Sequence, residues 1–331
     1  MGNNLHLKRN NSRNFFTVAP GIWGMKDIFV NIYMIMNPFD GNWVLVDAGL
    51  FTSYSKIKKM AARLFGDNSQ PSAIILTHGH FDHVGSLQKL AEEWNVPVYS
   101  HYLEIPYLTG KSSYPPGDPT VGGGLMSLMS WAYPKHPINI WNHINILPEN
   151  ETVPGLPEWK YFHTPGHSPG HISLFREGDG VLIAGDALVT TKAESAFSVM
   201  LQIKKISGPP KYFTPDWVSA RQSVKTLMKL EPKTVASGHG KPMYGKEVRK
   251  SLHKLSEDFY HLAVPVQGRY ILEPAVSDAS GVIYIPPSNF NKKRMVIKLL
   301  SFVAVSAAAY VLLKQKSKNK RRQEILSYEI W

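Results

Sequence analysis

Residues 77–85 read Thr77-His78-Gly79-His80-Phe81-Asp82-His83-Val84-Gly85 and place three histidines and one aspartate within six positions. The apolar stretch 72–76 runs directly into this segment and is predicted to be a short buried strand. Imidazole and carboxylate groups hold zinc, iron or manganese in proteins where thiolates are absent. Alternation along the chain puts His78 and His80 on one side, and the turn that follows directs Asp82 and His83 to a neighbouring site. The segment therefore predicts two metal ions at the end of a strand.

Three further segments end predicted strands with metal-ligand residue types in glycine-containing turns. The loop 163–171 reads HTPGHSPGH, the segment 182–186 reads LIAGD, and the segment 236–240 reads ASGHG. Glycine allows the chain to turn sharply at such points. Ligands that arrive from the same edge of a sheet converge, so we expect these segments to contribute to one shared site.

Together these motifs resemble those of the metallo-β-lactamase superfamily of metallo-hydrolases, and the resemblance extends over about residues 20–260. The family pattern comprises HxHxDH, a histidine after Pro-Gly, an aspartate after Gly and a final Gly-His, and all of these are met. The resemblance implies an α/β (α+β) chain folded as a four-layer αβ/βα sandwich, with the site at one edge of two facing sheets. It also implies two divalent metal ions, zinc above all, with iron or manganese as alternatives.

Carried onto this sequence, the resemblance implies seven metal ligands and a supporting set around them. Asp47 matches a family aspartate that hydrogen-bonds ligands, the alternative being a residue that only closes its strand. His163 and His171 flank the ligand of their loop and are expected to support it rather than to bind metal. The expected ligands are His78, His80 and His167 for the first ion, Asp82, His83 and His239 for the second, and Asp186 bridging both.

The resemblance further implies a metal-dependent hydrolase (EC 3 class), in which a hydroxide bridging the two ions attacks an ester, lactone or thioester carbonyl. Asp82 is the expected catalytic residue, which orients the hydroxide and passes a proton to the leaving group. Three alternatives stay open: a phosphodiesterase of the same superfamily, a persulfide-dioxygenase-like oxidoreductase with a single iron, and a metal-binding scaffold without turnover. The complete set of seven ligands favours the binuclear hydrolase.

At several positions this sequence differs from individual subgroups of the family, which limits the subgroups that it resembles. His80 stands where flavodiiron electron-transfer proteins have glutamate, and Asp186 is lacking in the true β-lactamases, so an antibiotic substrate is not expected. Lactonases carry a tyrosine three residues beyond the bridging aspartate, where this chain has Val189. The glyoxalase II-type thioesterases share the HTPGHSPGH stretch, but their basic glutathione-binding segment has no clear match. What remains is a resemblance to uncharacterised bacterial hydrolases, and the motifs leave the physiological substrate open.

The segment 111–147 interrupts the pattern of strands and helices. It begins rich in proline and glycine and then becomes apolar. Long irregular insertions in compact domains are often functional loops, so we expect a lid, the alternative being a satellite helix packed on the core. The candidate substrate-pocket residues are Met126, Met129 and Trp131 from this segment and Lys192, which could meet an acidic group or simply be solvated.

Elsewhere strands and helices alternate, which indicates sheets covered by helices. Residues 27–36 and 43–47 are predicted to form a hairpin, and 51–65, 215–230 and 248–263 to form helices. We expect a hydrolase domain over residues 14–264, followed by a C-terminal extension and linker over 265–291 and a tail over 292–331.

The net charge of +12 resides at the ends of the chain. Residues 1–13 carry +3 and residues 292–331 carry +8, which leaves +1 for the body. A nearly neutral body argues against a nucleic-acid partner, and a small-molecule substrate is expected instead. The complete absence of cysteine excludes disulfides, thiolate zinc sites and cysteine nucleophiles, and the oligomeric state stays open.

The tail contains an apolar stretch, 295–313, with basic residues on both sides. Nineteen helical residues span about 28 Å, close to the hydrocarbon thickness of a bilayer, so a single-pass C-terminal transmembrane helix is predicted. The alternative is an amphipathic terminal helix on a cytoplasmic soluble protein. The N-terminal residues lack the apolar core of a signal peptide, so we expect the catalytic domain to be cytoplasmic and attached to a membrane.

Overall fold

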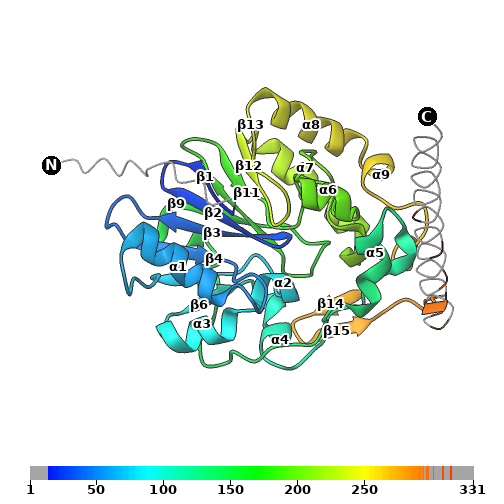
Figure 1. Cartoon of the computed structure of the whole chain (residues 1–331), viewed down its shortest axis with the longest axis horizontal. Helices are drawn as coiled ribbons and strands as arrows, with labels where there is room; N and C mark the ends of the chain where they lie inside the picture. The colour runs from blue at the N-terminus through cyan, green and yellow to red at the C-terminus, as the bar shows by residue number, and fades with distance from the viewer. Residues whose placement is uncertain are drawn as a thin grey trace, which may run out of the picture. The chain divides into compact units, whose positions relative to one another are not determined.

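The computed structural model describes residues 14–288 and, beyond them, residues 290, 291, 293, 296, 297, 301, 308 and 314. The contacts between residues divide the chain into two compact units, Met1–Pro287 and Ser288–Trp331, and each is described by itself. The described part of the first unit contains two large sheets, a small separate hairpin and the helices that cover the sheets (Figure 1).

The first sheet has seven strands in their sequence order. Its first four strands are antiparallel neighbours and its last four are parallel. The predicted hairpin of residues 27–36 and 43–47 forms as β3 and β4, whereas the hairpin before it was not predicted. The strands are β1 (Phe15–Ala19), β2 (Ile22–Asp27), β3 (Val30–Met36), β4 (Trp43–Val46), β5 (Ala73–Ile75), β6 (Val98–Ser100) and β7 (Ile144–Ile146).

The second sheet has six strands in the order β13-β12-β11-β10-β9-β8. Its β11 and β12 are parallel, and the other neighbours are antiparallel. A separate antiparallel hairpin consists of β14 and β15. These strands are β8 (Thr152–Val153), β9 (Leu156–His163), β10 (Ile172–Arg176), β11 (Val181–Ile183), β12 (Thr234–Ala236), β13 (Met243–Tyr244), β14 (Val276–Asp278) and β15 (Gly281–Tyr284).

The covering helices follow the apolar spacing of the sequence. In α3 (Leu87–Trp94) the buried side chains Leu87, Leu90 and Ala91 recur at helical spacing, and the helix ends at Asn95 in a left-handed conformation. The other long helices are α1 (Tyr54–Phe65), α7 (Trp217–Lys229) and α8 (Lys246–Glu257). Shorter ones are α2 (Phe81–Val84), α4 (Ile105–Leu108), α5 (Leu125–Met129), α6 (Ala196–Leu201), α9 (Phe259–Leu262), and the 3₁₀ turns η1 (Tyr102–Glu104), η2 (Pro119–Val121), η3 (Ser130–Ala132) and η4 (Lys211–Phe213).

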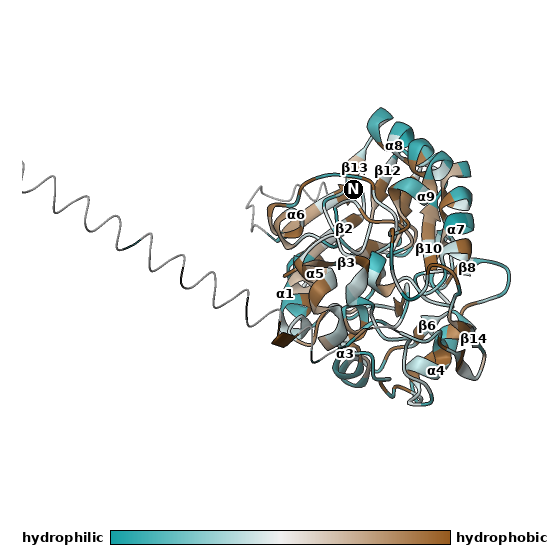
Figure 2. Ribbon diagram, turned by 90° about the vertical axis from the view of Figure 1, so that its right-hand side faces the viewer, coloured by the Kyte–Doolittle hydropathy of each residue, from teal (hydrophilic) through white to brown (hydrophobic). Residues whose placement is uncertain are grey.

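Three apolar clusters hold these elements in layers. One packs α1 and α3 on the outer face of the first sheet, and another packs α7 and α8 on the outer face of the second. The third lies between the sheets, where Ile35 and Val46 of the first meet Leu174 and Ile183 of the second. Figure 2 shows the hydrophobic colour on the inner strands and the hydrophilic colour along α8. The predicted mixed α/β architecture, with sheets covered by helices, is confirmed.

The topology gathers several strand ends at one edge of the molecule. β4 and β5 run parallel in the first sheet, and β11 and β12 run parallel in the second. At this edge the two sheets are joined, because the amide of Asn31 donates to the carbonyl of Gly238 over 2.7 Å and that of Ile172 to the carbonyl of Thr77 over 2.9 Å. Loops that follow these strands therefore meet between the sheets.

The segment 111–147 is built of η2, α5 and η3 and ends in β7 at the edge of the first sheet. Asp118 fastens its first part, since the carboxylate accepts from the amide of Arg269 over 2.5 Å. The unpredicted hairpin of β14 and β15 packs on the same segment, with the amide of Val282 donating to Ser112 Oγ over 3.0 Å. The C-terminal extension and linker expected over 265–291 thus contacts the segment 111–147 through Arg269 and Val282.

The predicted membrane anchor requires a correction. Among the residues that the structure describes, none of the helices is long and apolar enough to cross a membrane. The predicted span 295–313 lies almost entirely outside the described residues. The predicted C-terminal hydrophobic helix, and with it the membrane as a partner, is therefore not supported. Length and apolar composition of a stretch alone were too weak a basis for that prediction.

Candidate metal centre

Four segments bring the predicted ligands together at the shared edge of the sheets. β5 leads into the loop with His78 and His80, and the short α2 that follows carries Asp82 and His83. The loops after β9, β11 and β12 deliver His167, Asp186 and His239 in turn. All seven side chains are buried. The structure therefore gathers every predicted ligand from across 162 positions of the chain.

The seven side chains form three overlapping groups whose ligand atoms lie within 4.8 Å of one another. Asp186 is the common neighbour: its Oδ2 lies 3.5 Å from His167 Nε2 and 3.0 Å from His239 Nε2, and its Oδ1 lies 3.8 Å from His83 Nε2. This central carboxylate has the placement needed to touch two neighbouring ions. The groups are His78, His80 and His167; His78, His83 and Asp186; and Asp82, His83 and His239.

Unpartnered buried atoms test whether cations fit this cluster. His78 Nε2, His83 Nε2, His167 Nδ1 and Asp186 Oδ1 are buried and have no hydrogen-bond partner. Leaving a buried polar atom without a partner costs about 1–3 kcal/mol, so four in one place demand another explanation. Divalent ions would satisfy them, and a set of imidazoles and carboxylates suits zinc, iron or manganese.

Burial and mutual charge divide the histidines into two classes. Burial lowers the pKa of His78 and His167 well below the usual value and that of His80 to about 3, so these rings are neutral and their lone pairs are available. Burial also lowers the pKa of His83 and His239, but nearby carboxylates outweigh it and raise the values to about 10 and about 9. Positive charge already resides where metal ions would bind.

The same buried histidines also shift the pKa of Asp186. Burial raises its pKa, but His239, His83 and His167 outweigh burial and hold the pKa well below its usual range. The carboxylate is therefore ionised and available as an anionic ligand.

Asp47 orients one of the predicted ligands. Its backbone is left-handed, with φ of +61°, a conformation that aspartate tolerates better than most residues. Its Oδ1 accepts from the amide of Thr77 and its Oδ2 from Thr77 Oγ1, both over 2.8 Å. The same Oδ2 lies 2.8 Å from His83 Nδ1. Asp47 thereby turns His83 Nε2 towards the cluster, which is the supporting placement expected from the sequence.

His171 supports Asp186 without facing the ions. Its Nε2 accepts a hydrogen bond from the Asp186 amide over 2.8 Å, and its Nδ1 lies 2.8 Å from Thr164 Oγ1. Burial lowers the pKa of His171 to about 3, which keeps the ring neutral and able to accept. With both ring nitrogens engaged, His171 has no free lone pair for a metal ion.

His163 lies on the outer side of the same loop. Its ring stacks on that of His101, with centroids 4.0 Å apart and planes at 11°. Its Nε2 donates to the carbonyl of Pro169 over 2.8 Å. None of the three ligand groups includes it.

Replacement of these two histidines separates a metal ligand from a support. We expect His167→Ala to lose at least one ion per chain, because two of the three neutral imidazoles of the first group would remain. His163→Ala should keep the wild-type metal content and lose the stacking contact with His101 and the hydrogen bond to the Pro169 carbonyl, each about 0.5–1.5 kcal/mol. Elemental analysis and urea unfolding of both variants measure this. Equal metal loss in the two variants would contradict the assignment within the loop.

A tether from the first sheet, unforeseen from the sequence, positions the loop of His239. The side-chain amide of Asn31 donates to the carbonyls of Ser237 and Gly240 over 2.8 and 2.6 Å. Tyr33 Oη donates to the same Ser237 carbonyl over 2.7 Å. His239 Nδ1 donates to a carbonyl in the loop before β3, which leaves its Nε2 towards Asp186. The only sequence signal was a polar Asn31 within an apolar strand.

An aromatic wall borders the metal cluster, and we define it as Phe81, Tyr133, Tyr212 and Phe213. Its ring centroids lie 5.1–6.3 Å apart in neighbouring pairs. Phe213 also lies 5.0 Å from the ring of His80. After burial, the charge of Asp82 is the next cause that raises the pKa of Tyr133 and Tyr212. Asp82 directly follows Phe81 of this wall, and its Oδ2 lies 3.6 Å from His239 Nε2 of the metal cluster.

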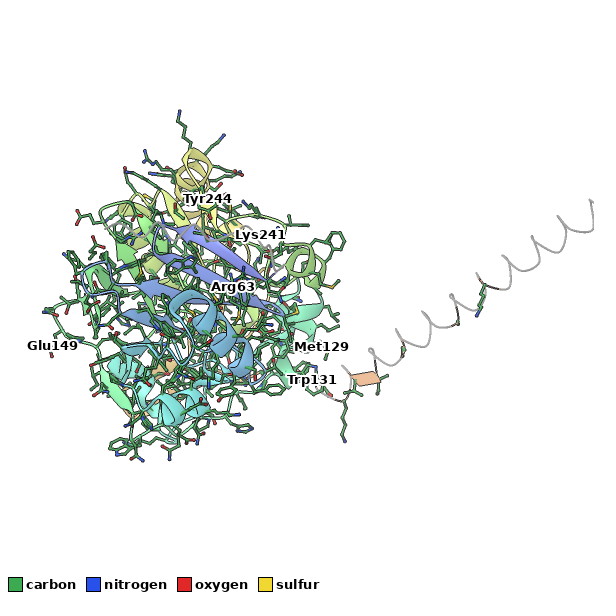
Figure 3. All side chains as sticks on the ribbon, turned by 60° about the vertical axis from the view of Figure 1, so that its left-hand side comes forward. Arg63, Met129, Trp131, Glu149, Lys241 and Tyr244 are labelled. Carbon is green, nitrogen blue, oxygen red and sulfur yellow. The ribbon has the colours of Figure 1, made fainter. Side chains whose placement is uncertain are left out.

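The four predicted pocket residues differ in their positions. Met126 packs against the cluster of Val121, Tyr212 and Phe213, and its Sδ lies 3.7 Å from Tyr133 Oη. Figure 3 shows Met129 and Trp131 close to each other at one edge of the first unit. Lys192 is exposed. Among the four, Met126 is the one whose described contacts place it beside the aromatic wall, and pocket roles for the others stay predictions.

Comparison with known proteins agrees with this geometry. The family model of the metallo-beta-lactamase superfamily matches residues 25–239, and the chain belongs to that superfamily. It is 46% identical over 242 residues to the probable metallo-hydrolase YflN of Bacillus subtilis, covering 73% of this chain and 92% of the relative. A second probable metallo-hydrolase of that organism, YybB, is 28% identical, covering 64% of this chain and 83% of the relative.

Solved structures show the same fold. A metallo-beta-lactamase family protein from Thermus thermophilus superposes with a TM-score of 0.52 at 19% identity, covering 74% of this chain and 81% of that one. The subclass B3 metallo-beta-lactamase BJP-1 of Bradyrhizobium japonicum superposes with a TM-score of 0.50 at 20% identity, covering 75% of this chain and 92% of that one. At these identities the likeness concerns the fold.

Proposed function

We propose that the protein is a binuclear metal-dependent hydrolase that cleaves an ester, lactone or thioester. The observation that carries the proposal is the set of three overlapping ligand groups, with the Asp186 carboxylate 3.0–3.8 Å from ring nitrogens of His83, His167 and His239. Two ions that share one carboxylate account for all seven side chains, whereas a single ion would leave several of them buried without a role. Relatives named as probable metallo-hydrolases support a hydrolytic reaction.

In this proposal the protein's own residues hold the metal ions, orient the attacking water and transfer a proton. His78, His80 and His167 would hold one ion, Asp82, His83 and His239 the other, and Asp186 both. When bound, two divalent ions lower the pKa of water towards neutrality and polarise a carbonyl oxygen. Asp82 would orient the attacking water and carry its proton to the leaving group, because its carboxylate belongs to a ligand group and the residue directly follows Phe81 of the aromatic wall.

The substrate class follows from the groups around the cluster. The aromatic wall, with Met126 packed against Tyr212 and Phe213, offers an apolar surface next to His80, on which Phe81 and Tyr133 are partly exposed. An apolar acyl or aryl group would bury its surface there at about 25 cal/mol per Å². We therefore favour an uncharged carbonyl substrate with an apolar acyl portion.

Metal analysis combined with a substrate panel tests the proposal. Protein purified without chelator should contain close to two zinc, iron or manganese ions per chain. It should hydrolyse lactones, thioesters or aryl esters faster as the acyl chain lengthens, and phosphodiesters slowly. One metal ion per chain under metal-replete conditions, or oxygen uptake with a persulfide, would overturn the proposal in favour of a mononuclear iron oxidoreductase.

A further inference from the structure

We infer that Glu104 is a positioning residue that clamps the two loops carrying the ligands of the first ion. It belongs to η1, which follows β6 in the first sheet, and lies at least 21 positions from any predicted ligand. The inference rests on the proposed binuclear site, because it assigns Glu104 a role in holding His78, His80 and His167 together.

Each carboxylate oxygen of Glu104 serves one loop. Oε1 accepts from Ser168 Oγ and from the amide of Gly170, both over 2.8 Å. Oε2 accepts from the amide of Gly79 over 2.9 Å and from Tyr114 Oη. Gly79 lies between His78 and His80, and Ser168 follows His167. The carboxylate therefore connects the backbones on which all three ligands of the first group are mounted.

The close fit around Glu104 explains two of the loop glycines. A Cβ at Gly170 would lie 2.8 Å from Glu104 Cγ, and a Cβ at Gly79 would lie 2.5 Å from Tyr114 Oη. Both loops thus need glycine to approach the clamp. Tyr114 is also held, because its ring stacks on Tyr107 with centroids 3.9 Å apart and lies 4.5 Å from the ring of His80.

Glu104 is fully buried, and the four groups that donate to it are neutral. Burial raises the pKa of Glu104, and the four donors oppose that rise by stabilising the charged form. Burying a charged carboxylate costs free energy unless hydrogen bonds replace those it made with water, and here four donors do so. A carboxyl group also offers an acceptor to each loop at once, which no neutral side chain of the same size can do.

Glu104→Gln is the sharpest substitution, because a glutamine has one acceptor oxygen where the clamp needs two. Hydroxyl groups of Ser168 and Tyr114 can reverse and accept, but the amides of Gly79 and Gly170 can only donate. One of these amides would therefore face the glutamine amide, and one loop would be released. Removal of a group that orients metal ligands typically lowers metal affinity about 10–100-fold.

The experiment measures zinc affinity by competition with a chromophoric chelator, together with urea unfolding of the metal-free protein. We expect Glu104→Gln to weaken one of two tight sites about 10–100-fold and to leave the other within about 3-fold. Tyr114→Phe removes one donor to the same oxygen and should weaken the same site by a smaller factor. Glu104→Ala removes the hydrogen bonds to both loops and should weaken the same site at least as much as Glu104→Gln.

Asp118→Asn is the matched control. Asp118 is also buried and accepts from two amides, of Thr120 over 2.9 Å and of Arg269 over 2.5 Å, but it connects no ligand loops. Its replacement should lower the stability of the metal-free protein and leave zinc affinity unchanged. Wild-type affinity in Glu104→Gln, or equal weakening in Asp118→Asn, would overturn the clamp. A wild type that binds no metal would overturn the proposed function itself.

Discussion

Replacing Asp82 by alanine is expected to lower turnover about 10²–10⁴-fold, the range typical for loss of a residue that transfers a proton. Asp82 is buried, its Oδ2 lies 3.6 Å from His239 Nε2, and its charge reaches Tyr133 and Tyr212. The group of His78, His80 and His167 does not include it, so the variant should retain at least one ion. Elemental analysis and steady-state kinetics on the best substrate of the panel measure both outcomes.

Asp216→Ala is the control for Asp82→Ala. The carboxylate of Asp216 caps α7 by accepting from the amides of Val218 and Ser219, both over 3.0 Å. Loss of such a cap costs about 0.5–2 kcal/mol of stability, and Asp216 lies outside the three ligand groups. The control should therefore unfold earlier in urea yet keep wild-type turnover. Activity of Asp82→Ala within a few-fold of the wild type would remove Asp82 from the mechanism.

The fold was predictable where periodicity and motifs agree. The hairpin of β3 and β4 and the helices α1, α7 and α8 have clear apolar spacing, and the structure contains them. The hairpin of β1 and β2 was missed, since Trp23, Gly24 and Met25 do not alternate between apolar and polar residues. In β1 only Val18 is buried, and in β2 the adjacent Gly24 and Met25 are both buried, so neither strand has the strict period-2 pattern that identifies a half-exposed strand.

The clustering of the predicted ligands could be foreseen from the sequence, whereas the residues that hold them in place could not, and the role of the cluster as metal ligands stays a prediction. His and Asp at strand ends are conspicuous in sequence because few structural roles require them in that pattern. Glu104, Tyr114 and Asn31 act through contacts with backbone groups 25–209 positions away, and no local pattern reports such contacts. The membrane prediction depended on the length and apolar composition of 295–313, a stretch that lies almost entirely outside the described residues, and none of the described helices is long and apolar enough to cross a membrane.

Replacing Gly238 by alanine is expected to remove at least one metal ion by a purely steric route. A Cβ at this position would lie 2.1 Å from Asp186 Oδ1 and 2.8 Å from His83 Cε1. The backbone cannot retreat, because the amide of Gly238 donates to Gly185 over 2.9 Å and its carbonyl accepts from Asn31 over 2.7 Å. Asp186 must therefore move out of the position in which we propose that it bridges two ions, and we expect zinc affinity to fall at least about 100-fold, with a stability loss of about 1–3 kcal/mol.

Gly178→Ala separates this effect from the general cost of replacing a glycine. A Cβ at Gly178 meets no atom within 4 Å, and neither Gly178 nor Gly238 has the left-handed backbone that disfavours a side chain. The control should therefore match the wild type in zinc affinity and in urea unfolding. The added methyl at Gly238 removes none of the proposed ligands. A loss of metal in Gly238→Ala would therefore result from displacement of the Asp186 carboxylate and not from its removal. Two tightly bound ions in folded Gly238→Ala would mean that Asp186 need not occupy this position, and the bridging role would have to pass to another group.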